Sequence, residues 1–141
     1  MLTEVRSETS EVFLARILVV EDDLIVATDL KEILTKNGHV VTGIARSGQD
    51  ALESVKIQTP DLILMDVLLQ DNITGIEVAL LLENFLGKSV RVIYLTALPL
   101  QNFPEFRGKI NDCTFINKPF AEEEVIACIE KLLAKRKKSS R

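Results

Sequence analysis

The chain has 141 residues, a formal net charge of -4 at pH 7 and no tryptophan. This length suffices for one domain with its own hydrophobic core. The net negative charge argues against a nucleic-acid binder, because phosphate contacts need a basic face. No segment reaches the ~20 apolar residues of a membrane span, and the polar first residues lack the apolar stretch of a signal peptide. We therefore expect a cytoplasmic protein that binds neither nucleic acid nor membrane.

The first part of the chain alternates between apolar runs and amphipathic patterns. Residues 1–14 are predicted to form a flexible arm. The elements predicted after it, each bounded by capping or breaking residues, are a strand at 16–20, a helix from Asp23 and Leu24 to Asn37-Gly38, a strand around 40–44, and a helix from Ser47 to Thr59-Pro60.

The second part continues the alternation, which favours an α/β fold with a parallel sheet. Pro99 and Pro104 predict that a helix within 97–112 is short or distorted. The other elements are a strand at 62–66, a loop at 67–74, a helix at Gly75–Leu86 closed by Gly87, strands at Val90–Leu95 and Cys113–Asn117, and a helix from about Ala121 to Lys135, followed by a basic tail at 136–141.

Polar residues suited to phosphate chemistry follow four of these apolar strands. Near-continuous apolar runs are typical of strands buried on both faces of a parallel sheet. Such sheets place their chemistry just outside the carboxyl ends of the strands. We therefore expect residues far apart in the sequence to converge on one pocket, namely Glu21, Asp22, Asp66, Thr96 and Lys118-Pro119.

Three carboxylates near one point repel each other unless a cation joins them. Oxygen ligands favour a hard divalent metal such as Mg²⁺, with Mn²⁺ as a substitute. A carboxylate can also act as a nucleophile towards phosphorus and form an aspartyl phosphate. The transfer then needs charge neutralisation and a hydroxyl donor, which Lys118 and Thr96 supply.

Four segments, in order and in strand context, resemble the receiver domains of two-component response regulators, of the single-domain kind. They are Ile17–Asp23, Pro60–Asp66, Tyr94–Ala97 and Lys118–Phe120. The resemblance runs from about Arg16 to Leu133 and implies a receiver domain over residues 15–135. It implies a flavodoxin-like, five-stranded parallel sheet in the order 2-1-3-4-5 with five flanking helices.

The resemblance also implies a role for each site residue. Asp66 would accept a phosphoryl group from a histidine kinase or a phosphotransfer protein. The implied Mg²⁺ ligands are Glu21, Asp22, Asp66 and the backbone carbonyl of Leu68. Thr96 and Lys118 would contact the phosphoryl group.

Thr96 and Phe115 would form a switch, in which the hydroxyl moves inward on phosphorylation and the aromatic ring follows. The switch would alter the surface of the fourth helix, fifth strand and fifth helix. That surface would bind a downstream protein, or a second copy in a homodimer. On this reading the chain is a signalling domain and not an enzyme.

The residues are also compatible with two other functions. One is a docking module that never needs phosphate. The other is an aspartate-nucleophile phosphatase, against which Leu68 argues because those enzymes usually carry a second aspartate there. We also expect an aliphatic Leu68 to change the lifetime of the phosphorylated state, because many receiver domains carry a polar residue there.

Several polar residues also have a simpler, structural interpretation. Asp22 or Asp23 alone would be read as a helix cap, and His39 as structural. Cys113 and Cys128 match no metal-ligand spacing and are predicted to be reduced thiols.

Overall fold

The computed structural model describes residues 14–69, 73–97 and 114–139. Several expectations fall outside these ranges. They are the arm at 1–14 (apart from Leu14), the tip of the loop at 67–74, nearly all of the segment 97–112 with its short or distorted helix, Cys113, and the end of the basic tail.

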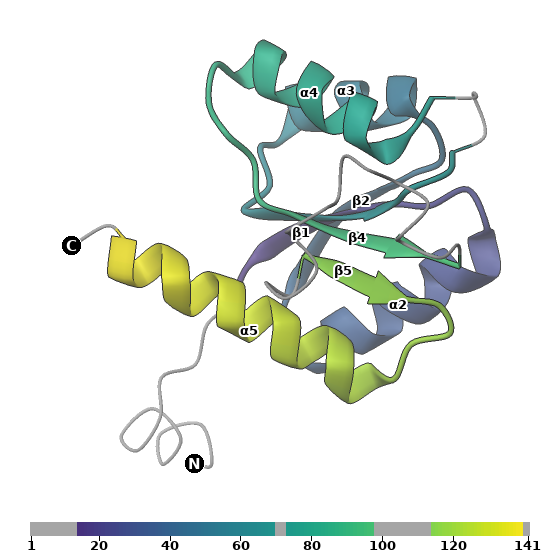
Figure 1. Cartoon of the computed structure of the whole chain (residues 1–141), viewed down its shortest axis with the longest axis vertical. Helices are drawn as coiled ribbons and strands as arrows, with labels where there is room; N and C mark the ends of the chain where they lie inside the picture. Colours follow the sequence, from purple (N-terminus) through teal and green to yellow (C-terminus); the bar gives the residue numbers. More distant parts are fainter. Residues whose placement is uncertain (1–13, 70–72, 98–113, 140–141) are drawn as a thin grey trace.

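Five parallel strands form one sheet in the order β2-β1-β3-β4-β5, as predicted for a flavodoxin-like fold (Figure 1). Four helices accompany it within the described residues. In chain order the elements are β1 (Arg16–Val20), α2 (Leu24–Lys36), β2 (Val40–Ala45), α3 (Gly48–Ile57), β3 (Leu62–Asp66), α4 (Gly75–Leu86), β4 (Val92–Thr96), β5 (Phe115–Asn117) and α5 (Glu122–Ser139).

The sheet lies between two helical layers, with α3 and α4 on one face and α2 and α5 on the other (Figure 1). Successive strand residues point to opposite faces, so each central strand contributes to two cores. On β1, for example, Ile17 and Val19 belong to the core under α2 and α5, whereas Leu18 and Val20 belong to the core under α3 and α4. This double burial explains why the strands read as nearly continuous apolar runs.

Side chains cap α2 and α3 at the residues that the sequence predicts. Asp23 accepts from the backbone N–H groups of Ile25 and Val26, and Ser47 accepts from that of Asp50. At α4, Thr74 and Glu77 form a reciprocal capping box. Gly87 ends this helix in the left-handed conformation, with φ of 71°.

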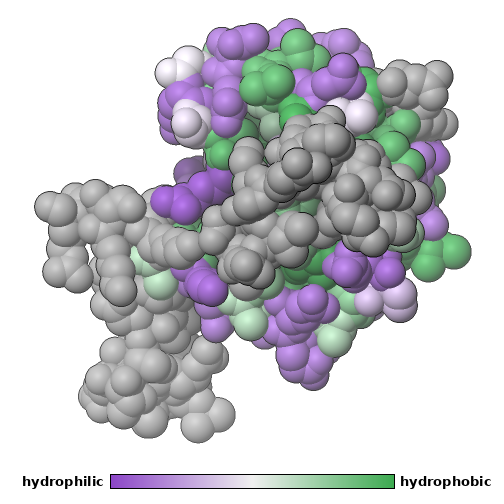
Figure 2. Space-filling view, in the orientation of Figure 1, coloured by the Kyte–Doolittle hydropathy of each residue, from purple (hydrophilic) through white to green (hydrophobic). Residues whose placement is uncertain are grey.

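Helix α4 carries apolar side chains on its surface as well as in the core. Leu80, Leu81 and Phe85 are about half exposed, and Figure 2 shows apolar atoms among polar ones over this helix. A helix with apolar residues on several faces gives weak periodicity. Its ends are therefore defined by the capping box and by Gly87.

Three predicted boundaries were wrong. The strand predicted from Val90 begins at Val92, because the N–H of Val90 donates to a carboxylate oxygen of Glu83. The strand predicted from Cys113 begins at Phe115, where its pairing with β4 begins. The last helix continues beyond Lys135 to Ser139, since the basic residues there are good helix formers.

The lone histidine and a cysteine lie in the interior. His39 is buried, and its Nδ1 accepts a hydrogen bond from the backbone N–H of Ala15 at 3.1 Å, consistent with the structural role expected of it. Cys128 is a buried free thiol. None of the described helices has the length and apolar content that crossing a membrane requires.

Candidate functional site

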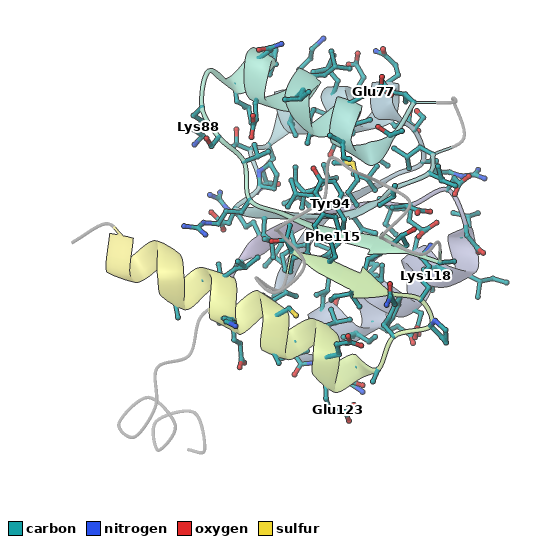
Figure 3. All side chains as sticks on the ribbon, in the orientation of Figure 1. Glu77, Lys88, Tyr94, Phe115, Lys118 and Glu123 are labelled. Atoms are coloured by element: carbon teal, nitrogen blue, oxygen red, sulfur yellow. The ribbon has the colours of Figure 1, made fainter. Side chains whose placement is uncertain are left out.

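The polar residues that follow the strands gather at the carboxyl end of the sheet. Glu21 and Asp22 come directly after β1, Asp66 ends β3, and Thr96 ends β4. Lys118 follows β5 and points into the same end of the sheet (Figure 3). The predicted convergence of these five residues is therefore present in the structure.

Lys118 joins two of the carboxylates. Its Nζ lies 2.7 Å from Oε1 of Glu21 and 3.2 Å from Oδ2 of Asp66. Glu21 and Asp66 are buried, and the Lys118 side chain is only 18% exposed. The ammonium is thus held between side chains that are 97 and 52 residues away in the sequence.

The acidic side chains form a compact cluster. Carboxylate oxygens of Glu21, Asp22 and Asp66 lie within 4.8 Å of one another. Burial raises the pKa of Glu21 to about 7, and the negative charge of Asp66 adds to this, while Lys118 opposes it. Three carboxylates facing one ammonium leave negative charge in excess. This donor set therefore fits a hard divalent cation such as Mg²⁺.

Lys118 remains charged in this setting. Burial alone would lower its pKa, but the hydrogen bond to Glu21 and the charges of Asp66 and Glu21 outweigh burial and raise the pKa above its ordinary value. A positive charge thus lies beside Asp66, on a side chain that is only 18% exposed. The peptide bond from Lys118 to Pro119 is cis.

The neighbouring residues Asp22 and Asp23 have different roles. Asp23 caps α2, so the carboxylate of Asp22 can join the cluster. The backbone carbonyl of Asp22 accepts a hydrogen bond from Nη2 of Arg46 at 3.3 Å. Sequence reasoning missed Arg46, and no local signal marks it, because the contact links two loops that are 24 residues apart.

The loop after Asp66 folds tightly against the site. The N–H of Leu68 donates to Oδ1 of Asp66 at 3.2 Å, and the Leu68 side chain is half exposed. Gly75 donates its N–H to the carbonyl of Val67 at 2.7 Å. A Cβ atom at Gly75 would lie 2.4 Å from the carbonyl oxygen of Asp66. This contact requires glycine, a requirement that the sequence reasoning did not recognise.

The two residues predicted to form a switch lie on neighbouring strands, Thr96 on β4 and Phe115 on the edge strand β5. Thr96 is 1% exposed at the end of β4. Phe115 is 8% exposed and packs against Val67, the residue that follows Asp66. Phe115 therefore lies outside the acidic cluster but contacts the backbone segment that carries it.

A groove opens beside the cluster. It has a volume of about 520 Å³ and is lined by residues of α2, by Ala97 after β4 and by the loop after β5, namely Ile25, Val26, Asp29, Ala97, Lys118, Pro119 and Phe120. Its walls are mostly apolar, and Ile25 is 82% exposed. Lys118 is therefore shared between the buried cluster and a surface depression.

Comparisons with known proteins agree with this architecture. The family model described as the response regulator receiver domain matches residues 17–130. The chain is 32% identical to the chemotaxis protein CheY of Bacillus subtilis, covering 84% of this chain and 97% of CheY. It is 30% identical to the transcriptional regulatory protein PdtaR of Mycobacterium tuberculosis, covering 82% of this chain and 55% of PdtaR.

Solved structures give the same result. The response regulator PhyR from Brucella abortus superposes with a TM-score of 0.79 at 28% identity, covering 99% of this chain and 56% of the PhyR chain. The fold and the acidic cluster thus define a signalling domain of the two-component type. The chain belongs to the response regulator receiver domain family. It spans about half the length of PdtaR and PhyR.

Receiver domains share several general properties. Receiver domains are signalling domains and generally not enzymes, and they bind Mg²⁺ through an acidic pocket. They interact with kinases and with downstream targets. The acidic cluster of Glu21, Asp22 and Asp66 is the group in the described part of this chain that corresponds to such a pocket.

Proposed function

We propose that the chain is a phosphorylation-dependent switch whose phosphoacceptor is Asp66. A histidine kinase or a phosphotransfer protein supplies the phosphoryl group, and the modified domain changes its binding to another protein. The observation that carries this proposal is the contact of Lys118 with both Glu21 and Asp66 inside the acidic cluster. It gives Asp66 a fixed positive charge and, next to it, a site for a divalent cation.

The residues that would hold Mg²⁺ are Glu21, Asp22, Asp66 and the backbone carbonyl of Leu68, and the ion would neutralise charge on the phosphoryl oxygens. In the transfer, a carboxylate oxygen of Asp66 forms a bond to phosphorus, and the phosphorus–nitrogen bond to the donor histidine breaks. Little acid–base chemistry is required of the protein.

Lys118 and Thr96 complete the arrangement. The Lys118 ammonium pairs with a phosphoryl oxygen after the transfer, which replaces part of its present contact with Asp66. The Thr96 hydroxyl donates to another phosphoryl oxygen. Because both side chains are largely buried, these interactions form in a medium of low dielectric constant and are stronger than in water.

The groove beside Lys118 is suited to the donor protein. Its apolar wall includes the exposed side chain of Ile25, and an apolar patch next to a reactive site favours protein docking. On the output side, Thr96 and Phe115 would connect the site to the surface formed by β5 and α5. A downstream protein or a second copy of the chain would recognise that surface.

The first test is intact-protein mass spectrometry after incubation with Mg²⁺ and acetyl phosphate. Wild type should gain one phosphoryl group, and Asp66→Asn should gain none. EDTA should also prevent the modification. Asp61→Asn is a matched control, because Asp61 lies at the opposite end of the sheet and pairs with Arg16. An adduct of equal yield in Asp66→Asn would contradict the assignment.

The same variant separates the switch from a docking module. If phosphate governs partner binding, wild type and Asp66→Asn should differ in affinity for a captured partner once the donor is added. A docking module that does not need phosphate predicts equal affinities with and without the donor.

A further inference from the structure

An aromatic pair connects the last two strands of the sheet. Tyr94 on β4 is the parallel register partner of Phe115 on β5. Their ring centroids are 5.2 Å apart with an interplanar angle of 18°, and Figure 3 shows the two rings next to each other. Offset stacking of this kind is favourable beyond the apolar area that it buries. Phe115 therefore cannot move relative to β4 without losing this contact.

The pair lies between the acidic cluster and the edge of the sheet. Phe115 packs against Val67, which follows Asp66, and Tyr94 and Ile76 pack at the margin of the same small cluster. Tyr94 and Thr96 are two residues apart on one strand, so their side chains point to the same face. The stack is thus adjacent to both the phosphoacceptor segment and the hydroxyl residue.

Tyr94 is the fixed member of the pair. Its ring also packs against the core under α3 and α4. Burial raises the pKa of its hydroxyl to about 12, and Glu83 adds to the shift, so the side chain is neutral at physiological pH. β5 is a three-residue edge strand with one neighbour, and Phe115 is its first residue. The Tyr94 ring is therefore held by the core, and the Phe115 ring packs against it.

We propose that Tyr94 is a positioning residue, which holds the Phe115 ring in its buried position and thereby raises the affinity of the site for a phosphoryl group. This inference rests on the proposed function and on the expected switch, in which the Phe115 ring moves inward when Asp66 is phosphorylated. Coupling free energies are reciprocal. A contact that shifts the ring towards its buried position therefore raises the affinity for a phosphoryl group, by at most the factor by which it shifts the ring.

The chain carries its own reporter for this coupling. It has one tyrosine and no tryptophan, so its ultraviolet fluorescence above 300 nm comes from Tyr94. Beryllofluoride with Mg²⁺ is a probe that imitates a phosphoryl group on a carboxylate. Titrating wild type with it should change the Tyr94 emission, with a midpoint equal to the dissociation constant measured by ¹⁹F NMR. An unchanged emission at saturation would overturn the inference.

Two substitutions separate stacking from the hydroxyl group. Tyr94→Leu removes the stack, and we expect beryllofluoride to bind about two- to tenfold more weakly, as ¹⁹F NMR would measure. Tyr94→Phe keeps the ring and should bind within twofold of wild type. Equal affinity of Tyr94→Leu and wild type would contradict the inference.

Ile93→Val is the control for a merely structural effect. Ile93 is buried on the opposite face of β4, in the core under α2 and α5. Its truncation should lower the melting temperature and leave the beryllofluoride affinity unchanged. If Ile93→Val weakens binding as much as Tyr94→Leu does, the effect is general destabilisation and the inference fails.

Failure of the inference can be told from failure of the proposed function. If wild type neither binds beryllofluoride nor forms an adduct with acetyl phosphate, both fail. If wild type does both and Tyr94→Leu matches it, only the role of Tyr94 fails.

Discussion

The two ends of the sheet each contain a carboxylate paired with a basic side chain, but they differ in burial and crowding. At the amino end, Asp61 accepts from the backbone N–H of Arg16 at 2.8 Å, and Nε of Arg16 lies 3.6 Å from the same carboxylate oxygen. The Arg16 side chain is 52% exposed there. At the carboxyl end, Lys118 is 18% exposed between two buried carboxylates.

The difference in burial explains why the ion pairs at the two ends of the sheet have different roles. The exposed pair at the amino end joins β1 to the start of β3, and solvent screens its charges. At the carboxyl end, burial strengthens each interaction, and the carboxylates outnumber the basic group. Excess buried charge is costly unless a ligand balances it. The donor set at the carboxyl end therefore suits a bound cation, whereas the pair at the amino end joins two strands.

The largest expected effect is the difference between removing the basic residue at the carboxyl end and removing the one at the amino end. Lys118→Ala should slow phosphorylation of Asp66 by acetyl phosphate about 10²-fold, because it removes a preorganised charge from the site. Arg16→Ala should leave the rate within about twofold, because its charge lies at the other end of the sheet and is screened by solvent. Time courses by intact-mass spectrometry measure both rates. Equal losses in the two variants would contradict the comparison.

Mg²⁺ should stabilise the protein through the carboxyl end alone. At about 100 times its dissociation constant, it should add about 2.7 kcal/mol to the free energy of unfolding. Urea unfolding with and without Mg²⁺ measures this increment. Asp66→Asn should lose most of it and Asp61→Asn should keep it. The same increment in Asp66→Asn would place the metal elsewhere.

Two glycines at the ends of α4 provide the next comparison. Gly75→Ala places a Cβ atom against the carbonyl of Asp66, so it should destabilise the fold by about 1–3 kcal/mol and weaken Mg²⁺ binding. Gly87→Ala meets no atom within 4 Å but has φ of 71°. It should cost about 1 kcal/mol and leave Mg²⁺ binding unchanged. Calorimetric titration would show whether only the first variant affects the metal.

The smallest effect is a pH dependence at the amino end. Burial lowers the pKa of His39 below its ordinary value, although Glu130 opposes the shift. The unfolded chain therefore binds the proton more readily. The contribution of His39 to stability is complete above about pH 6.5 and declines as the pH falls towards the folded pKa, by at most about 1.4 kcal/mol per pH unit.

Protonation would also remove the Nδ1 acceptor that Ala15 uses. The check is urea unfolding of wild type and His39→Gln between pH 5 and 8. The difference between their slopes isolates the contribution of His39, which is the only histidine. Parallel curves would show that His39 contributes nothing to the pH dependence.

Local chemistry made most of the fold predictable. Capping residues such as Asp23 and Ser47 mark helix starts, because a side-chain oxygen must satisfy N–H groups that lack partners. Apolar runs mark the buried strands, and parallel topology then brings Asp66 and Lys118 to one edge. These arguments depend on neighbours in sequence or on general rules of sheet geometry.

Boundaries set by distant partners were not predictable in this way. Val90 is β-branched and therefore favours a strand. Its N–H nevertheless donates to Glu83, and β4 begins two residues later. β5 is limited by the three residues of β4 that it pairs with. Neither the Glu83 contact nor this register is visible in a local pattern.

The sequence by itself determined the family, the order of strands and helices, and the candidate site residues, because each depends on residue type and spacing. Only the tertiary structure decided that Lys118 contacts Glu21 and Asp66 together, that Gly75 must lack a side chain, and that Tyr94 stacks on Phe115. These contacts join residues that the sheet brings to within a few ångströms, so they exist only once the chain has folded.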